Sequence, residues 1–150
     1  MPRYQQVGFT LIEMIWVIVL MGLMAMLGIP RIRDALQKQS VRSARVAGAT
    51  LVVKARTAAV QRGCRAVVHM RGDGRMWVTV CRTTGVAGVD TLGGVDDFTI
   101  RYGVTVVPSR DSIEYGPRGL TLGNQAGQVL FQRTPHADTL TVNAVGKVTR

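Results

Sequence analysis

The chain has 150 residues, of which 47% are hydrophobic, and it carries a formal net charge of +10. This length allows one membrane helix and one small soluble domain. Beside one membrane helix and its extension, about 90 residues remain for a modest sheet packed on a helix. The positive charge fits either attraction to an anionic membrane surface or nucleic-acid binding, and composition alone favours the first.

An apolar run from Phe9 to Ile29 is introduced by the sequence Gly8-Phe9-Thr10-Leu11-Ile12-Glu13. As a helix this run is about 31 Å long, enough to cross the hydrocarbon core of a bilayer. Glu13 is unexpected there, because a carboxylate at the centre of a membrane helix costs about 2.5–3.5 kcal/mol and marks a functional candidate. An ordinary secretory signal has a shorter apolar region without an acid. If the chain is cut between Gly8 and Phe9, the new ammonium group of a neighbouring subunit becomes a partner for Glu13.

The stretch from Gly8 to Glu13 resembles the class III signal of type IV pilins and type II secretion pseudopilins. The resemblance implies that residues 1–8 are a leader and that residues 9–29 form a transmembrane assembly helix. A prepilin peptidase would cut after Gly8 and N-methylate Phe9, Glu13 would guide filament assembly, and Pro30 would mark a kink. The implied partners are other pilins or pseudopilins, the peptidase/N-methyltransferase and an inner-membrane assembly platform.

The charges that flank the apolar run and the resemblance predict opposite membrane topologies. Arg31, Arg33 and Lys38 follow the run and only Arg3 precedes it, so the positive-inside rule places the C-terminal domain in the cytoplasm. The resemblance implies a single-pass protein of the bacterial inner membrane with a periplasmic C-terminal domain. Such a protein then enters a periplasmic pseudopilus or a cell-surface pilus. We follow the resemblance, partly because of the two cysteines described below.

Residues 30–62 are predicted to be an amphipathic extension of the membrane helix. Their apolar residues recur at steps of three and four, and Gly63 is a natural stop. Pro30 lacks the N–H that would bond to the carbonyl of residue 26, so a kink is expected near it.

A hairpin is predicted next, from β-rich runs at 64–70 and 75–81 around Gly72-Asp73-Gly74. With Gly72-Asp73 as a two-residue loop, Cys64 falls opposite Cys81 at about 4.5 Å between Cα atoms, within disulfide range. With Asp73-Gly74 as the loop, the cysteines are offset by two residues. A disulfide fits a periplasmic domain, and two unpaired buried thiols are the alternative.

The rest of the chain is predicted to consist of β-strands and loops. Residues 82–97 are predicted to be a long loop and residues 98–107 a strand with a bulge at Gly103. Further strands are expected at 112–115, 129–133, 139–145 and 147–149. The predicted fold class is therefore α+β, with a long N-terminal transmembrane helix packed against an antiparallel β-sheet or β-sandwich domain.

Later segments narrow the resemblance to the GspH/FimT family, which comprises minor pseudopilins of type II secretion and minor pilins of type IV pili. The similar segments are Lys54-Ala55-Arg56, the Cys64–Cys81 hairpin, Tyr115 to Gly119 and Leu140 to Lys147. The resemblance implies a β-rich globular domain over residues 63–150 and a place at or near a filament tip. It does not separate the two filament systems.

The sequence shows no catalytic, metal or cofactor site. Gly72-Asp-Gly-Arg lacks the spacing and the following helix of a phosphate-binding loop. His69 is expected in a strand and His136 in a loop, far apart. Asp96-Asp97 offers too few oxygens for calcium and is interpreted as a solvated turn. We therefore expect a protein that is not an enzyme.

The C-terminal residues allow a second function. Family members that bind DNA for natural transformation end in a Gly-Arg-x-Arg pattern, which Gly146-Lys147-Val148-Thr149-Arg150 resembles loosely. On a strand Lys147 and Arg150 point to opposite faces. Arg133, Lys147 and Arg150 are the candidate DNA-binding residues, and the alternative is an edge strand whose basic residues discourage edge pairing.

Overall fold

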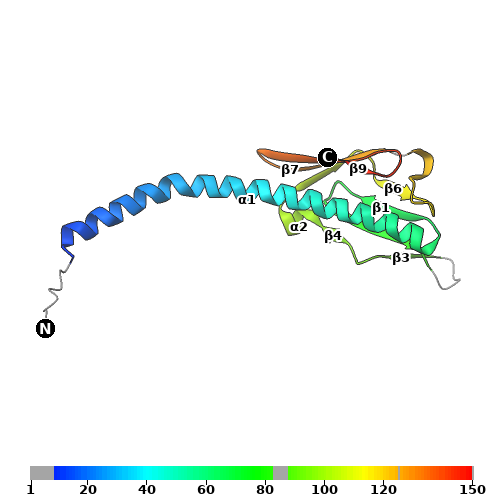
Figure 1. The fold of residues 1–150 in the computed structure, drawn as a ribbon, viewed down its shortest axis with the longest axis horizontal. Helices are drawn as coiled ribbons and strands as arrows, with labels where there is room; N and C mark the ends of the chain where they lie inside the picture. The colour runs from blue at the N-terminus through cyan, green and yellow to red at the C-terminus, as the bar shows by residue number, and fades with distance from the viewer. Residues whose placement is uncertain (1–8, 83–87, 125, 150) are drawn as a thin grey trace, which may run out of the picture. The chain divides into compact units, whose positions relative to one another are not determined.

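The computed structural model describes residues 9–82, 88–124 and 126–149. The chain divides into two compact units, residues 1–36 and 37–150. Helix α1 (Leu11–Arg62) belongs to both, and Pro30 lies inside it. All strands among the described residues belong to the second unit (Figure 1).

Helix α1 ends where the sequence predicts. Gly63 follows the last helical residue with φ 61°, a left-handed conformation that glycine adopts at low cost. The Gly63 N–H donates to the Val60 carbonyl at 3.3 Å and the Cys64 N–H to the Ala59 carbonyl at 3.2 Å. These two bonds form a Schellman motif, which satisfies carbonyls that a helix end leaves unpaired.

The strands form two antiparallel sheets, which lie along the C-terminal half of α1 (Figure 1). Sheet A has the order β3-β2-β1-β6, with β4 also paired to β2. Sheet B has the order β5-β7-β8-β9. Sheet A consists of β1 (Ala66–Met70), β2 (Arg75–Cys81), β3 (Val89–Thr91), β4 (Asp96–Asp97) and β6 (Ser112–Tyr115). Sheet B consists of β5 (Thr105–Pro108), β7 (Gly127–Arg133), β8 (His136–Val142) and β9 (Val148–Thr149).

One hydrophobic core joins α1 to both sheets. The helix contributes mainly small residues to it, and at Gly48 the approach is so close that a Cβ would lie 2.7 Å from the Phe131 ring. Phe131 and Tyr115 are among the largest fully buried side chains. Small helix residues let the aromatic rings of the sheets come close to the helix axis. The buried helix residues are Val41, Ala44, Gly48, Leu51, Val52, Ala55, Ala58 and Ala59.

The segment from 98 to 107 differs from the prediction. Residues Phe98–Tyr102 form a short helix, α2, and only Thr105–Pro108 is a strand. The Asp97 carboxylate caps α2 by accepting the N–H groups of Thr99 and Ile100, both at 3.0 Å. Gly103 is the C-cap of α2 and not a bulge. Local side-chain capping and burial of the Phe98 ring outweigh the β-branched composition of this stretch.

The predicted loop at 82–97 and two residue placements are also corrected. Within its described part, this stretch contributes β3 and β4 to sheet A. Asp96 and Asp97 therefore lie in a strand that pairs with β2, and not in a solvated turn. His136 opens β8, paired with Arg133 across a two-residue turn. A short 3₁₀ segment, η1 (Leu122–Asn124), precedes β7.

Candidate functional site

The N-terminal motif is described from Phe9 onward, and Gly8 lies outside the described residues. An 18-residue window of helix α1 has a mean hydropathy of 2.3, and none of it is buried within the chain. By length and composition this segment can cross a membrane. Large apolar residues of this part of α1, such as Leu11 at 80%, are exposed, and lipid or other helices would cover them.

Thr10 has a role that the sequence analysis missed. Its hydroxyl oxygen accepts the Glu13 N–H at 3.3 Å, and its carbonyl accepts the N–H groups of Glu13 and Met14 at 3.1 and 3.2 Å. Thr10 is thus the N-cap of α1 with Glu13 at the third helical position, the Thr-x-x-Glu spacing of a capping box. That spacing is the signal that sequence reasoning could have used. Glu13 therefore also has a local role, since a carboxylate in the first turn interacts favourably with the helix dipole.

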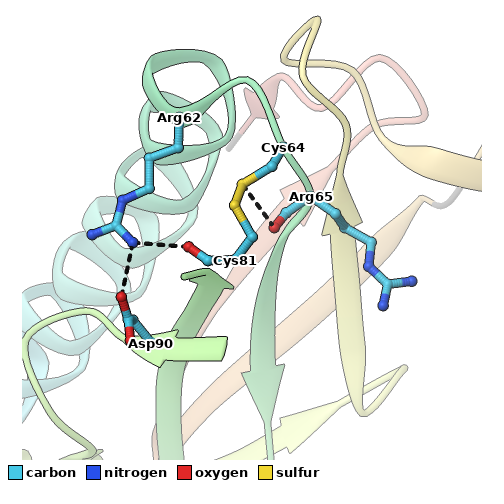
Figure 2. The surroundings of a disulfide bond; sticks show 5 residues. All are labelled: Arg62, Cys64, Arg65, Cys81 and Asp90. Atoms are coloured by element: carbon cyan, nitrogen blue, oxygen red, sulfur yellow. Dashed lines mark hydrogen bonds and ion pairs between the residues drawn. A yellow bond between two sulfur atoms is a disulfide. The ribbon is translucent and has the colours of Figure 1, made fainter. Parts of the chain in front are cut away.

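The two cysteines are joined in a disulfide beside the end of α1 (Figure 2). Cys64 lies between Gly63 and β1, and Cys81 is the last residue of β2, with 6.2 Å between their Cα atoms. The bond ties the C-terminal end of the helix to sheet A.

The register of the hairpin differs from both predicted registers. Ala66 pairs with Val80 and Met70 with Met76, which leaves Gly72-Asp73-Gly74 as a three-residue loop. Gly74 has φ 91° and donates to the Arg71 carbonyl at 3.1 Å, the arrangement of a turn followed by a left-handed residue. Cys64 and Cys81 are therefore offset by one residue, and the expected opposite pairing at about 4.5 Å is wrong.

Arg62 reinforces the same junction (Figure 2). Its Nη1 donates to the Cys81 carbonyl at 3.0 Å and to Asp90 Oδ2 at 3.2 Å. Arg82 Nε lies 3.2 Å from the other oxygen of Asp90. Hydrogen bonds from Arg82 and then Arg62 lower the pKa of the Asp90 carboxyl, so this carboxylate stays charged and bridges two arginines.

Several basic residues of α1 serve the fold. Arg45 Nε lies 2.7 Å from Asp138 Oδ2 in β8. Lys54 Nζ donates to the Leu92 carbonyl at 3.2 Å. Together with Arg62 these residues attach α1 to both sheets, so the positive charge of the helix is only partly available to an external partner.

Two of the candidate DNA-binding residues, Arg133 and Lys147, are not brought together. Arg133 Nη1 donates to Ser40 Oγ and to the Tyr102 carbonyl, both at 3.2 Å, so this guanidinium joins β7 to α1 and α2 and does not reach outward. Lys147 is exposed in the turn between β8 and β9, and Arg150 lies outside the described residues. Arg133 and Lys147 lie at opposite ends of β8, which is about 20 Å long.

The His69 side chain packs against neighbouring side chains of sheet A. His69 stacks on Trp77 with 4.8 Å between ring centroids, and its Nε2 lies 2.9 Å from Thr79 Oγ1. Burial and the Arg71 charge lower the His69 pKa, and Glu114 partly opposes this. In the described part of the chain, no group of three or more His, Cys, Asp or Glu residues could hold a metal ion.

Comparison with solved structures places this fold among known ones. The structure is similar to that of the type IV minor pilin FimU of Pseudomonas aeruginosa in two crystal forms, with TM-scores of 0.59 and 0.56. The matches cover 74% and 72% of this chain and 87% and 90% of the FimU chains, at 12% and 14% identity. The fold is pilin-like. No family model and no curated protein sequence matches the chain.

The pilin-like fold confirms the predicted α+β class, in which a long N-terminal helix with an apolar first half packs against antiparallel sheets. At such low identity the similarity concerns the fold alone.

Proposed function

We propose that this chain is a minor subunit of a type IV pilus or of a type II secretion pseudopilus, of the GspH/FimT kind. The observation that carries the proposal is one chain that combines a pilin-like fold with an unburied apolar helix introduced by Gly8-Phe9-Thr10-Leu11-Ile12-Glu13. The role is one of assembly and not of catalysis. The subunit joins other pilins or pseudopilins through this helix at or near the filament tip.

The proposed maturation divides the chain at the same motif. Residues 1–8 are the leader, residues 9–29 the transmembrane assembly helix, residues 30–62 its extension and residues 63–150 the periplasmic domain. A prepilin peptidase removes the leader and methylates Phe9, and an inner-membrane platform then builds the subunit into the filament. The disulfide supports the periplasmic placement, because disulfides persist in oxidising compartments.

Cleavage between Gly8 and Phe9 is the first expected result. Protein extracted from membranes should have the intact mass of a chain that starts at N-methylated Phe9, since the peptidase is expected to read the Gly8-Phe9 junction. A Gly8→Val variant should retain residues 1–8 and serves as the matched control. A wild-type chain that begins at Met1, or after Ile29, would contradict the proposal.

DNA capture is a second candidate role, supported by the net charge of +10 and by the exposed Lys147. The domain should then bind duplex DNA at low salt. Affinity should fall by about 0.9 log unit per log unit of salt for each phosphate neutralised. Titration at two salt concentrations measures this slope, and Lys147→Ala should weaken binding. Absence of binding at low salt would remove the role, and an unchanged Lys147→Ala variant would remove the C-terminal site.

A further inference from the structure

A cavity of about 480 Å³ opens on sheet A at the turn between β1 and β2 and the start of β6. Its volume lies within the range of small-molecule sites, about 300–1,000 Å³. In β1 the side chains of Val68 and Met70 are buried in the core, so the alternating residue His69 lies on the opposite face of the sheet, where the cavity is. The lining residues are His69, Arg71, Gly72, Asp73, Trp77, Asp111 and Ser112.

An aromatic surface in this cavity is held in place before any ligand arrives. His69 and Trp77 are direct partners across β1 and β2, and their rings are nearly parallel at 14°. The contact between His69 and Thr79 fixes the imidazole, and the Arg71 guanidinium lies 5.7 Å from the centre of the Trp77 ring. A side chain fixed in this way loses little conformational entropy when a ligand packs on it.

The polar groups around this surface do not favour a polyanion. The cavity is lined by one cation, Arg71, and two carboxylates, Asp73 and Asp111. The lowered pKa of His69 leaves the imidazole neutral at pH 7. Asp73 also lies 3.8 Å from Arg75, so the charges around the cavity nearly balance and give it no net attraction for phosphate groups, although the whole chain is basic.

The same groups suit a ligand that is rich in hydroxyl groups. Carboxylates accept hydrogen bonds from hydroxyls, a guanidinium donates to hydroxyl and ring oxygens, and the Ser112 hydroxyl does both. An aromatic ring offers an apolar surface for the C–H face of a sugar. Together, the lining residues provide both kinds of contact in one small space.

We propose that this cavity binds a neutral sugar unit of a glycan, packed on the exposed parts of the stacked His69 and Trp77 rings and hydrogen-bonded by Arg71, Asp111 and Ser112. The site lies within the folded domain, so it goes beyond the assembly role and does not depend on it. Failure of cleavage at Phe9 would leave this proposal standing.

The test uses the full chain in phosphatidylcholine nanodiscs, because maltoside detergents would compete with the ligand. The chain has two tryptophans, so a Trp16→Phe substitution leaves Trp77 as the only fluorescent one. Titration with the trimer of N-acetylglucosamine and with maltotriose should give a saturable change in Trp77 emission for at least one of them. Arg71→Ala and Asp111→Ala should each weaken that binding fivefold or more.

Two controls make the result specific. Arg118→Ala removes an exposed arginine outside the cavity and should leave binding unchanged. Oligothymidylate should give no saturable change at moderate salt. The proposal is overturned if neither glycan saturates, if Asp111→Ala and Arg71→Ala bind as well as the parent chain, or if oligothymidylate binds more tightly than both glycans. Trp77→Leu, checked for folding by circular dichroism, should lose the saturation-transfer NMR signal of the bound glycan.

Discussion

Replacement of both cysteines, Cys64→Ser/Cys81→Ser, is expected to lower the free energy of unfolding by about 3 kcal/mol. The disulfide spans a sequence separation of 17 and so closes a loop of 18 residues (17 + 1), which the chain-entropy relation converts to this value. Arg62 holds the same junction through Asp90, but both side chains are partly exposed, and such pairs contribute about 0–1 kcal/mol. The covalent bond should therefore dominate the stability of the junction.

Urea unfolding of a fragment comprising residues 37–150 measures this loss, because the buried core residues in the described part of the chain all lie at or after Val41. Reduction of the parent fragment with dithiothreitol should reproduce the stability of the double serine variant. A loss below about 1 kcal/mol would mean that the five residue pairs of the hairpin and Arg62 already keep its ends together. Adding Arg62→Ala to the double variant would then reveal the missing contribution. Free thiols in protein purified from cells would count against the periplasmic placement.

The second large effect is expected at Glu13. Glu13→Ala should leave the protein in the membrane, because removal of a carboxylate makes insertion easier by up to about 2.5–3.5 kcal/mol. The variant should be strongly depleted from sheared filaments. In the proposed assembly Glu13 pairs with the Phe9 ammonium of a neighbouring subunit, and removing one partner of a buried ion pair costs about 3–5 kcal/mol, a hundredfold or more in an equilibrium constant.

Thr10 provides the control that separates assembly from helix capping. Thr10→Ala removes the hydroxyl that accepts the Glu13 N–H but keeps the carboxylate, at a cost of about 1 kcal/mol of helix stability. Glu13→Gln keeps the size of the side chain and removes its charge. Quantitative immunoblotting of filament and membrane fractions should show loss for Glu13→Ala and Glu13→Gln and near-normal recovery for Thr10→Ala. Equal loss in all three variants would mean that the cap matters and the intersubunit pair does not.

Local patterns in the sequence determined the regular parts of this protein. The end of α1 at Arg62 follows from Gly63, because helix periodicity and a glycine stop act within a few residues. Strand β6 and the two hairpin strands follow from β-rich runs bounded by turn residues. The N-terminal motif is equally local, which is why a contiguous stretch of sequence could indicate an assembly function.

Three other features of this protein were decided only by the tertiary structure. The stretch after Asp97 forms a helix because the carboxylate caps it and the Phe98 ring packs on Phe131 at 5.6 Å, although its composition favours a strand. The hairpin register depended on how Gly74 closes the loop, and a change of one residue there moved the cysteines out of direct opposition. The Arg133 guanidinium is not directed outward for DNA binding, because it donates a hydrogen bond to Ser40, 93 residues away in sequence. The sequence gives the type and charge of each residue. Whether a charged group faces solvent or pairs with a partner within the fold is determined only by the tertiary structure.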